Sequence, residues 1–370
     1  MMRSKLLALL LSAVSALAAP EYPTLALGAV APDFRLPGVD GKTNSLSDFK
    51  DAKVLVMVFT CTHCPTAQLY EERMKALVTD YGTQGVAVVA VSCSSQAGLR
   101  LDELSWTDLD DSFPAMKLRA EDRGFNFPYL YDGDAPQAVS AAYGPVATPH
   151  VFVFDAARRL RYLGRIDDDE RGRNIKVHYV RDAVEALLAG REPPVTQTRP
   201  IGCSTKWHTK APQVAAYMEK LAAEPVTLEP AGAAALREVR ANTGDKLRLV
   251  TCWATWCPPC VAEFAEFVTI NRMYRGRAFE LVTVAMNKPE ESADVLAFLK
   301  KQQASNRNLQ VDSDDREKLM EALDPEWRGE IPYTLLIAPG GQVLHRESGA
   351  IDPLALRRII LKELNARRPW

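Results

Sequence analysis

Runs of apolar residues alternate with amphipathic segments along most of the chain. In the first half the apolar runs are typical of buried strands and lie at 54–59, 86–92, 127–131, 151–154 and 160–164. The segments between and after them predict helices at 65–81, 112–123, 136–143 and 179–189. Alternation of this kind predicts a largely parallel central sheet with helices on both faces.

The second half repeats this pattern. Its predicted elements are a helix at 231–240, a strand at 247–253, a helix at 261–274, a strand at 279–285, helices at 292–303 and 315–323, strands at 335–337 and 343–344, and a helix at 353–364. In each half a strand leads into Cys-x-x-Cys and a helix, and a proline precedes a strand hairpin far downstream. The chain therefore predicts two similar units in tandem.

A proline-rich segment separates the two halves. Pro193, Pro194 and Pro200 follow the last helix of the first half, and an amphipathic helix at 212–223 precedes Pro225. This composition is typical of a connector. We therefore expect a first domain at 24–205, a helical connector at 206–227 and a second domain at 228–370.

Residues 1–18 have the pattern of a secretory signal peptide. Arg3 and Lys5 precede an apolar stretch at 6–17, and small residues around Ala18 form a cleavage site. A membrane anchor fits less well, because about a dozen apolar residues cannot cross a hydrocarbon core of about 30 Å. The pattern predicts an exported protein, periplasmic or extracellular, with no membrane span after cleavage.

Charge and cysteine spacing restrict the class of function. A net charge of −2 over 370 residues argues against nucleic acid or an anionic membrane as a partner. Two of the cysteine pairs have Cys-x-x-Cys spacing, but they lie too far apart for a zinc ribbon, and neither precedes the His of a c-type haem site. The histidines show no metal-ligand spacing, so we expect neither a metal nor another cofactor. Catalytic dithiols explain the pairs best.

The more specific pair is Cys257 and Cys260, which follow Trp256 and enclose Pro258 and Pro259. We expect Cys257 at the N-cap of a helix, with both prolines in the first turn, where a missing N–H costs little. The positive end of the helix lowers the pKa of such a thiol and makes it the attacking group. Cys260 then closes the disulfide. A structural disulfide is the alternative.

The second pair, Cys61 and Cys64, encloses Thr62 and His63. We expect Cys61 to be the nucleophile and Cys64 the resolving cysteine, with a structural disulfide again as the alternative. An imidazole N–H or positive charge on His63 would stabilise a thiolate and make the pair more oxidising. An exposed turn residue without such a role is the other interpretation of His63.

With these residues, both halves resemble the thioredoxin superfamily. The second half is similar to exported thioredoxin-like proteins of the TlpA/ResA type, through residues 256–260, Glu263, Phe264 and Pro332. It departs from them at Thr251, where thioredoxins carry a buried acid, and at Ala265. The first half resembles the redoxin (AhpC/TSA, peroxiredoxin-related) family through segments 31–34, 59–65, 127–131, 148–149, 164–168 and 202–207. It departs at Ala147 and Cys93, and lacks the Pro-x-x-x-Thr-x-x-Cys motif of peroxiredoxins.

The resemblance implies two tandem thioredoxin-like folds, each a central mixed sheet flanked by helices. It also implies that Pro149 and Pro332 are cis prolines that face the dithiols and leave the preceding backbone free to pair with a substrate strand. The alternative is an ordinary trans proline at a strand edge. Cys93 and Cys203 are an additional redox pair, a static disulfide or two unrelated thiols, whereas Cys252 is a core residue.

These observations predict an exported thiol–disulfide oxidoreductase with one dithiol per domain, in which electrons pass between the domains. Its expected partners are protein thiols or disulfides, or a small disulfide or peroxide, together with an upstream thiol reductant. One alternative is a peroxide reductase whose first domain is reduced by the second. Another is a non-catalytic interaction module with structural disulfides.

Overall fold

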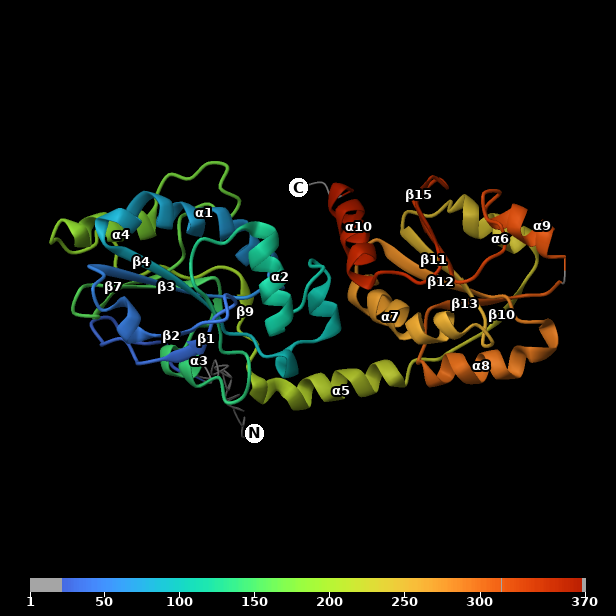
Figure 1. Ribbon diagram of the computed structural model, residues 1–370, viewed down its shortest axis with the longest axis horizontal. Coiled ribbons are helices and arrows are strands. Elements are labelled where there is room, and N and C mark those ends of the chain that lie inside the picture. The colour runs from blue at the N-terminus through green and yellow to red at the C-terminus, as the bar shows by residue number, and fades with distance from the viewer. Residues whose placement is uncertain (1–21, 314, 368–370) are drawn as a thin grey trace, which may run out of the picture.

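The computed structural model describes residues 22–313 and 315–367, which form two α/β units (Figure 1). The first unit has a five-stranded sheet in the order β5-β4-β3-β7-β8. Its strands are β3 (Val54–Thr60), β4 (Val86–Ser92), β5 (Tyr129–Tyr131), β7 (His150–Phe154) and β8 (Leu160–Gly164). β3 is buried along its whole length, parallel to β4 and antiparallel to β7. An unbroken apolar strand is expected where helices cover both faces of a sheet.

The helices of the first unit are α1 (Pro65–Tyr81), α2 (Phe113–Arg123), α3 (Ala138–Tyr143) and α4 (Tyr179–Leu188). Two short pairs complete the unit: β1 (Arg35–Pro37) with β2 (Thr43–Ser45), and β6 (Ala147–Thr148) with β9 (Cys203–Ser204). Two apolar clusters lie on the two faces of the sheet, one under α1 and α4 and the other under α3.

The second unit has a six-stranded sheet in the order β10-β13-β12-β11-β14-β15. Its strands are β10 (Glu229–Ala231), β11 (Leu247–Trp253), β12 (Phe279–Ala285), β13 (Arg307–Val311), β14 (Tyr333–Ile337) and β15 (Val343–Ser348). Its helices are α6 (Ala233–Ala241), α7 (Pro258–Tyr274), α8 (Ser292–Lys301), α9 (Arg316–Leu323) and α10 (Pro353–Ala366). α5 (Ala211–Ala222) runs below both units and joins them (Figure 1). Tandem mixed sheets flanked by helices confirm the predicted fold class.

The sequence analysis did not predict β10 and β13, and it started the α6 helix two residues too early. β13 has the sequence Arg-Asn-Leu-Gln-Val, which contains no apolar run. Its buried Asn308 donates instead to the carbonyl oxygens of Thr227 and Ala304. Buried polar side chains satisfied in this way hide a strand from hydrophobic patterning.

The two units contact each other at one end of α7. Leu99 and Leu104 of the first unit pack into the apolar cluster beneath α7 and α10. Tyr274, the last residue of α7, donates its hydroxyl to the carbonyl of Thr107 at 2.8 Å. Arg358 on α10 pairs with Asp108 at 2.9 Å. These contacts between described residues involve the C-terminal half of α7, whereas Cys257 lies at its N-terminus.

The predicted signal peptide at 1–18 lies outside the described residues. Within the described part of the chain, no helix is long and apolar enough to span a membrane. The domain boundaries at 205 and 228 stay predictions.

Candidate functional site

The second dithiol lies where β11 leads into α7. Cys257 is the N-cap of α7, and Pro258 and Pro259 occupy its first two positions, as the sequence predicted. Cys257 and Cys260 form a disulfide with an S–S distance of 2.06 Å. The Cys257 sulfur lies 3.7 Å from the carbonyl oxygen of Ile331, the residue before Pro332. The end of β11, the start of α7 and the loop at Pro332 therefore lie close together at the Cys257 sulfur.

The surroundings of this disulfide are partly open. Trp256, directly before it, is 52% exposed, whereas Trp253 is buried against Phe264. Glu263 lies one turn after Cys260 and accepts the N–H of Ile351 at 2.9 Å. Burial raises the pKa of this carboxyl. Thr251, the residue at which this unit departs from the buried acid of thioredoxins, is buried in β11.

The first dithiol differs in where its helix begins. α1 starts at Pro65, so its N-cap is Cys64, the second cysteine of the motif, and the Cys64 sulfur accepts the N–H of Ala67 at 3.4 Å. Thr62 and His63 stand where the second unit has two prolines. Unlike prolines they carry backbone N–H groups, and both donate to Asp111, at 2.8 and 2.9 Å. Hydrogen bonds to Asp111 therefore fix the turn between Cys61 and Cys64, whereas the two prolines restrict the corresponding backbone in the second unit.

Cys64 carries the electrostatic features that the sequence analysis expected for Cys61. Burial by itself would raise the pKa of Cys64, but hydrogen bonds from the thiols of Cys203 and Cys61 and from the backbone of Ala67 and Cys203 lower it well below the usual value. The Thr148 carbonyl, 3.1 Å from this sulfur, accepts from the protonated form and opposes these donors. Burial and the neighbouring Cys64 charge raise the pKa of Cys61.

His63 is buried and bound to the same acid. Its Nδ1 lies 2.5 Å from Asp111 Oδ2. Burial opposes the charged imidazole, but the negative charge and hydrogen bond of Asp111 raise the pKa of His63 overall. His63 is therefore not an exposed turn residue; it is part of a buried acid–base pair beside the thiols.

The structure brings Cys203 to the first dithiol and leaves Cys93 elsewhere. The backbone N–H of Cys203 donates to the Cys64 sulfur at 3.3 Å, and Cys203 packs with Cys61 and Cys64. Cys93 directly follows β4 and belongs to a different apolar cluster, with its thiol 3.6 Å from the carbonyl of Thr60. Burial raises the pKa of the Cys93 thiol. Cys252 lies in the core of the second unit, as expected.

The Thr148–Pro149 and Ile331–Pro332 peptide bonds are cis, which is the geometry that the resemblance implied. The Thr148 hydroxyl lies 3.1 Å from the Cys61 sulfur. The sequence analysis missed Thr148 and Asp111 as site residues. Asp111 precedes Ser112, the N-cap of α2, so its position suggested only a helix start.

One group within the described residues brings potential metal ligands together. Atoms of Cys61, His63 and Asp111 lie within 4.8 Å of one another. Asp111 already accepts hydrogen bonds from two backbone N–H groups and pairs with His63. These contacts explain the cluster as a hydrogen-bond network that shapes the thiol site.

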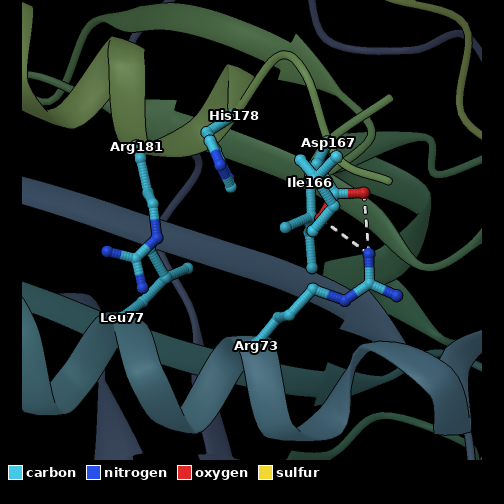
Figure 2. A pocket seen from close by; sticks show the side chains of 7 residues that line it. Arg73, Leu77, Ile166, Asp167, His178 and Arg181 are labelled. Atoms are coloured by element: carbon cyan, nitrogen blue, oxygen red, sulfur yellow. Dashed lines mark hydrogen bonds and ion pairs between the residues drawn. The ribbon is translucent and has the colours of Figure 1, made fainter. Parts of the chain in front are cut away.

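A pocket of about 270 Å³ lies between α1 and α4, away from the thiols (Figure 2). Arg73 and Leu77 on α1 face His178 and Arg181 across it. Asp167 binds the Arg73 guanidinium, which also donates to the carbonyl oxygens of Asp169 and Glu170. These hydrogen bonds from Arg73 therefore fix the loop at residues 167–170 against α1.

Comparison with known proteins agrees with this geometry. The AhpC/TSA family matches residues 27–163 and 222–346, one segment in each unit. The chain belongs to the AhpC/TSA family. Redoxins of this family have the thioredoxin-like fold, and the paired cysteines identify this member as a thioredoxin-superfamily oxidoreductase.

Individual relatives of this redoxin cover one unit at a time. The thiol-disulfide oxidoreductase ResA of Geobacillus thermodenitrificans (strain NG80-2) is 28% identical over 166 residues, which are 44% of this chain and 84% of the relative. A hypothetical protein from Sinorhizobium meliloti 1021 is 34% identical, covering 50% of this chain and 97% of its own, with a TM-score of 0.44. An uncharacterized conserved protein from Geobacillus kaustophilus is 36% identical, covering 50% of this chain and 94% of its own, also with a TM-score of 0.44.

Proposed function

We propose that this redoxin is an exported thiol–disulfide oxidoreductase with two dithiol sites, one in each unit. The observation that supports two sites is the repeated geometry. Each pair follows a buried strand, begins a 17-residue helix, and lies beside the residue that precedes a proline, Thr148 in one unit and Ile331 in the other. A structural disulfide does not require this arrangement twice.

The second site is the one that we assign to protein partners. The reduced Cys257 thiolate attacks a partner disulfide and forms a mixed disulfide, and Cys260 then attacks Cys257 and releases the reduced partner. Two thiols of the redoxin become one disulfide as one partner disulfide becomes two thiols. Trp256 is exposed beside the sulfur, so a partner surface can pack on it. An upstream thiol reductant restores the dithiol.

Trapping tests this assignment. In a Cys260→Ser variant expressed in the native compartment, we expect partner proteins to accumulate as mixed disulfides on Cys257. The same preparation from Cys257→Ser/Cys260→Ser is the control. Equal yields from the two variants would contradict a role for Cys257.

Electron exchange between the two sites requires movement of the units. Tyr274, where the first unit makes contact, follows Cys257 by 17 residues, and at 1.5 Å per residue the two lie about 26 Å apart along α7. Thiol–disulfide exchange requires the sulfurs to come within bonding distance, about 2 Å. We therefore propose that exchange occurs only after the contact at Thr107 and Tyr274 opens.

Two full-length variants measure this exchange. One lacks the first dithiol (Cys61→Ser/Cys64→Ser) and the other lacks the second (Cys257→Ser/Cys260→Ser). We expect intact protein reduced at the second site to reduce the first at a rate independent of protein concentration. If its rate instead rises in proportion to concentration and equals that of the mixed variants, exchange within one chain is excluded.

Peroxide reduction by the first unit is a second candidate function, because its thiols are buried and a protein surface cannot reach them without a change in structure. Cys61 is 3% exposed and Cys64 is 0% exposed. The Cys64 thiolate would take one oxygen from the peroxide to form a sulfenic acid, and a second thiol would displace water to form a disulfide. Peroxide consumption that persists in Cys64→Ser would rule out Cys64 in this role.

Redox titration separates both activities from a non-catalytic module. Potentials above about −300 mV and reduction by glutathione are expected for working dithiols. Two pairs that lie below that potential and resist glutathione would favour structural disulfides.

A further inference from the structure

A segment at residues 196–207, here called the strap, crosses the first dithiol site after the last helix of the first unit. Near its start, the Leu163 N–H donates to the carbonyl of Thr196, and the Thr198 N–H donates to the carbonyl of Leu163, both at 3.0 Å. Near its end, the Ser95 N–H donates to the carbonyl of Lys206 at 2.7 Å. The strap is therefore fixed on both sides of the thiols.

Between these anchors the strap occupies the backbone edge that a substrate strand would use. β9 pairs antiparallel with β6, with Thr148 opposite Cys203 and Ala147 opposite Ser204. The corresponding backbone of the second unit is Glu330 and Ile331. Within the described residues, neither of these belongs to a strand pairing. The edge is therefore paired with a strand in the first unit, whereas in the second unit the Glu330 carbonyl accepts a hydrogen bond from the Trp327 side chain instead.

Gly202 permits the close contact between the strap and β6, in which Cys203 and Ser204 pair with Thr148 and Ala147. This contact is here called the seat of the strap. Its φ is +144°, and a Cβ added there would lie 1.8 Å from the carbonyl oxygen of Thr148. No side chain fits at that distance from a backbone atom, so any larger residue must push the strap away from β6. The seat next to Cys64 thus depends on a glycine directly before Cys203.

The seat brings three thiols together. Cys64 accepts a hydrogen bond from the Cys203 backbone N–H at 3.3 Å, and Cys203 packs against Cys61 and Cys64 in one small cluster. The hydrogen bond to Cys64 and burial raise the pKa of Cys203, and the Lys206 ammonium on the same strap opposes this rise. Lys206 also donates to Glu103 at 2.6 Å. Cys64 is thus the acceptor at the centre, and each neighbouring thiol can attack it once it is oxidised.

We propose that Cys203 is the first disulfide partner of Cys64, held by the strap in the place of a substrate strand. The proposal rests on the proposed oxidoreductase function of the first site. The Cys64 thiolate attacks an incoming small disulfide, forms a mixed disulfide and releases one thiolate. Cys203 loses its proton to that thiolate, attacks the Cys64 sulfur and releases the second half of the small disulfide as a thiolate, which takes a proton from water. One small disulfide has then become two thiols, and two protein thiols have become the Cys64–Cys203 disulfide.

Cys61 acts after this step. Its thiolate attacks Cys64, breaks the Cys64–Cys203 bond and leaves a Cys61–Cys64 disulfide with Cys203 reduced. No external oxidant is needed, because one protein disulfide replaces another. In this proposal Cys203 pairs with Cys64 rather than with Cys93; a Cys93–Cys203 redox pair was one of the three alternatives that the sequence left open.

The test uses full-length Cys61→Ser protein, reduced and then exposed to oxidised glutathione. Samples are quenched over time, and the disulfide-linked peptides are mapped by mass spectrometry. We expect the Cys64–Cys203 peptide to form nearly completely, with little glutathione left on Cys64. The control, Cys61→Ser/Cys203→Ser, should accumulate one glutathione on Cys64.

The outcomes separate this proposal from the proposed function. Glutathione that stays on Cys64 in Cys61→Ser, with Cys203 free, would overturn the role of Cys203 but leave the oxidoreductase function intact. A Cys64 that takes up no glutathione in either variant would overturn the proposed function of the first site, and the role of Cys203 with it.

A glycine variant tests the seat with every thiol in place. In Gly202→Ala we expect closure of the Cys64–Cys203 disulfide to slow at least tenfold, and alkylation of reduced Cys64 to become at least tenfold faster. Gly82→Ala is the matched control, because a Cβ there meets no atom within 4 Å. If closure of the Cys64–Cys203 disulfide and alkylation of Cys64 proceed at equal rates in Gly202→Ala, Gly82→Ala and the wild type, the proposed role of the contact between the strap and β6 is wrong.

Discussion

The backbone N–H of Cys203 donates to the sulfur of Cys64 at 3.3 Å, although 139 residues separate the two in the chain. The first dithiol is therefore completed by a segment that follows the last helix of its own unit. Beside the second dithiol, no strand among the described residues pairs with Glu330 or Ile331, and the flanking Trp256 is exposed. Two sites built from one motif thus differ in what can reach them.

Alkylation of reduced protein at different pH values should distinguish Cys64 from the other thiols of the first unit. Hydrogen bonds lower the pKa of Cys64, so its thiolate persists as the pH falls. Burial raises the pKa of Cys61 and Cys93. Peptide-resolved iodoacetamide labelling should give a midpoint for Cys64 below the value of about 8.5 for free cysteine. A midpoint above that value would contradict the assignment of Cys64 as the thiolate.

Asp111 should be important for the stability of the first unit. Asp111→Ala leaves two backbone N–H groups and the buried His63 without their acceptor, so the free energy of unfolding should fall by about 3–5 kcal/mol. Chemical denaturation measures the loss. Asp108→Ala is the control, because Asp108 pairs with a more exposed Arg358 and its loss should cost about 1 kcal/mol or less.

The His63–Asp111 pair should also give stability a specific pH dependence. Because Asp111 raises the pKa of His63, the folded protein binds this proton more tightly than the unfolded chain. The stabilisation is complete below the unfolded pKa of about 6.5 and is lost as pH rises through the folded value. The stability difference between wild type and Asp111→Asn should therefore shrink with rising pH. A difference that grows would contradict a charged pair.

Glu263 should exchange protons with the second dithiol. Burial raises the pKa of its carboxyl, and it lies one turn from Cys260, whereas Thr251 cannot ionise. Glu263→Gln should slow disulfide exchange and change its pH profile without loss of folding. The native state also binds this proton more tightly than the unfolded chain, so stability falls as pH rises above about 4.3, and Glu263→Gln should remove that slope. An unchanged pH–rate profile would exclude the proton role.

Trp256→Ala should affect partner binding more than folding. The side chain is 52% exposed, so its loss should change the free energy of unfolding by about 0.5 kcal/mol or less. For a protein disulfide substrate we expect a higher KM, and for a small disulfide little change. An equal loss with both substrates would indicate that Trp256 acts on the sulfur chemistry itself.

Local sequence determined most of the central strands, the long helices and the position of the second dithiol. The apolar run Leu247–Trp253 predicts β11, and the two prolines after Cys257 predict the start of α7. Both signals depend only on residues that are neighbours in the sequence, so hydrophobic periodicity and residue type suffice for the prediction. β13 escaped prediction because its buried apolar residues, Leu309 and Val311, alternate with the polar Asn308 and Gln310, and Asn308 is satisfied by side-chain hydrogen bonds.

Only the tertiary structure decided which cysteine of the first motif is the helix cap and which thiols meet. The motif at 61–64 does not reveal that Asp111, from a distant loop, accepts the N–H groups of Thr62 and His63 and leaves Cys64 as N-cap. Nor does it reveal that β9 pairs with β6 and delivers Cys203 to Cys64. Hydrogen bonds between segments far apart in the sequence fix both the N-cap at Cys64 and the position of Cys203. Local sequence patterns cannot predict contacts of this kind.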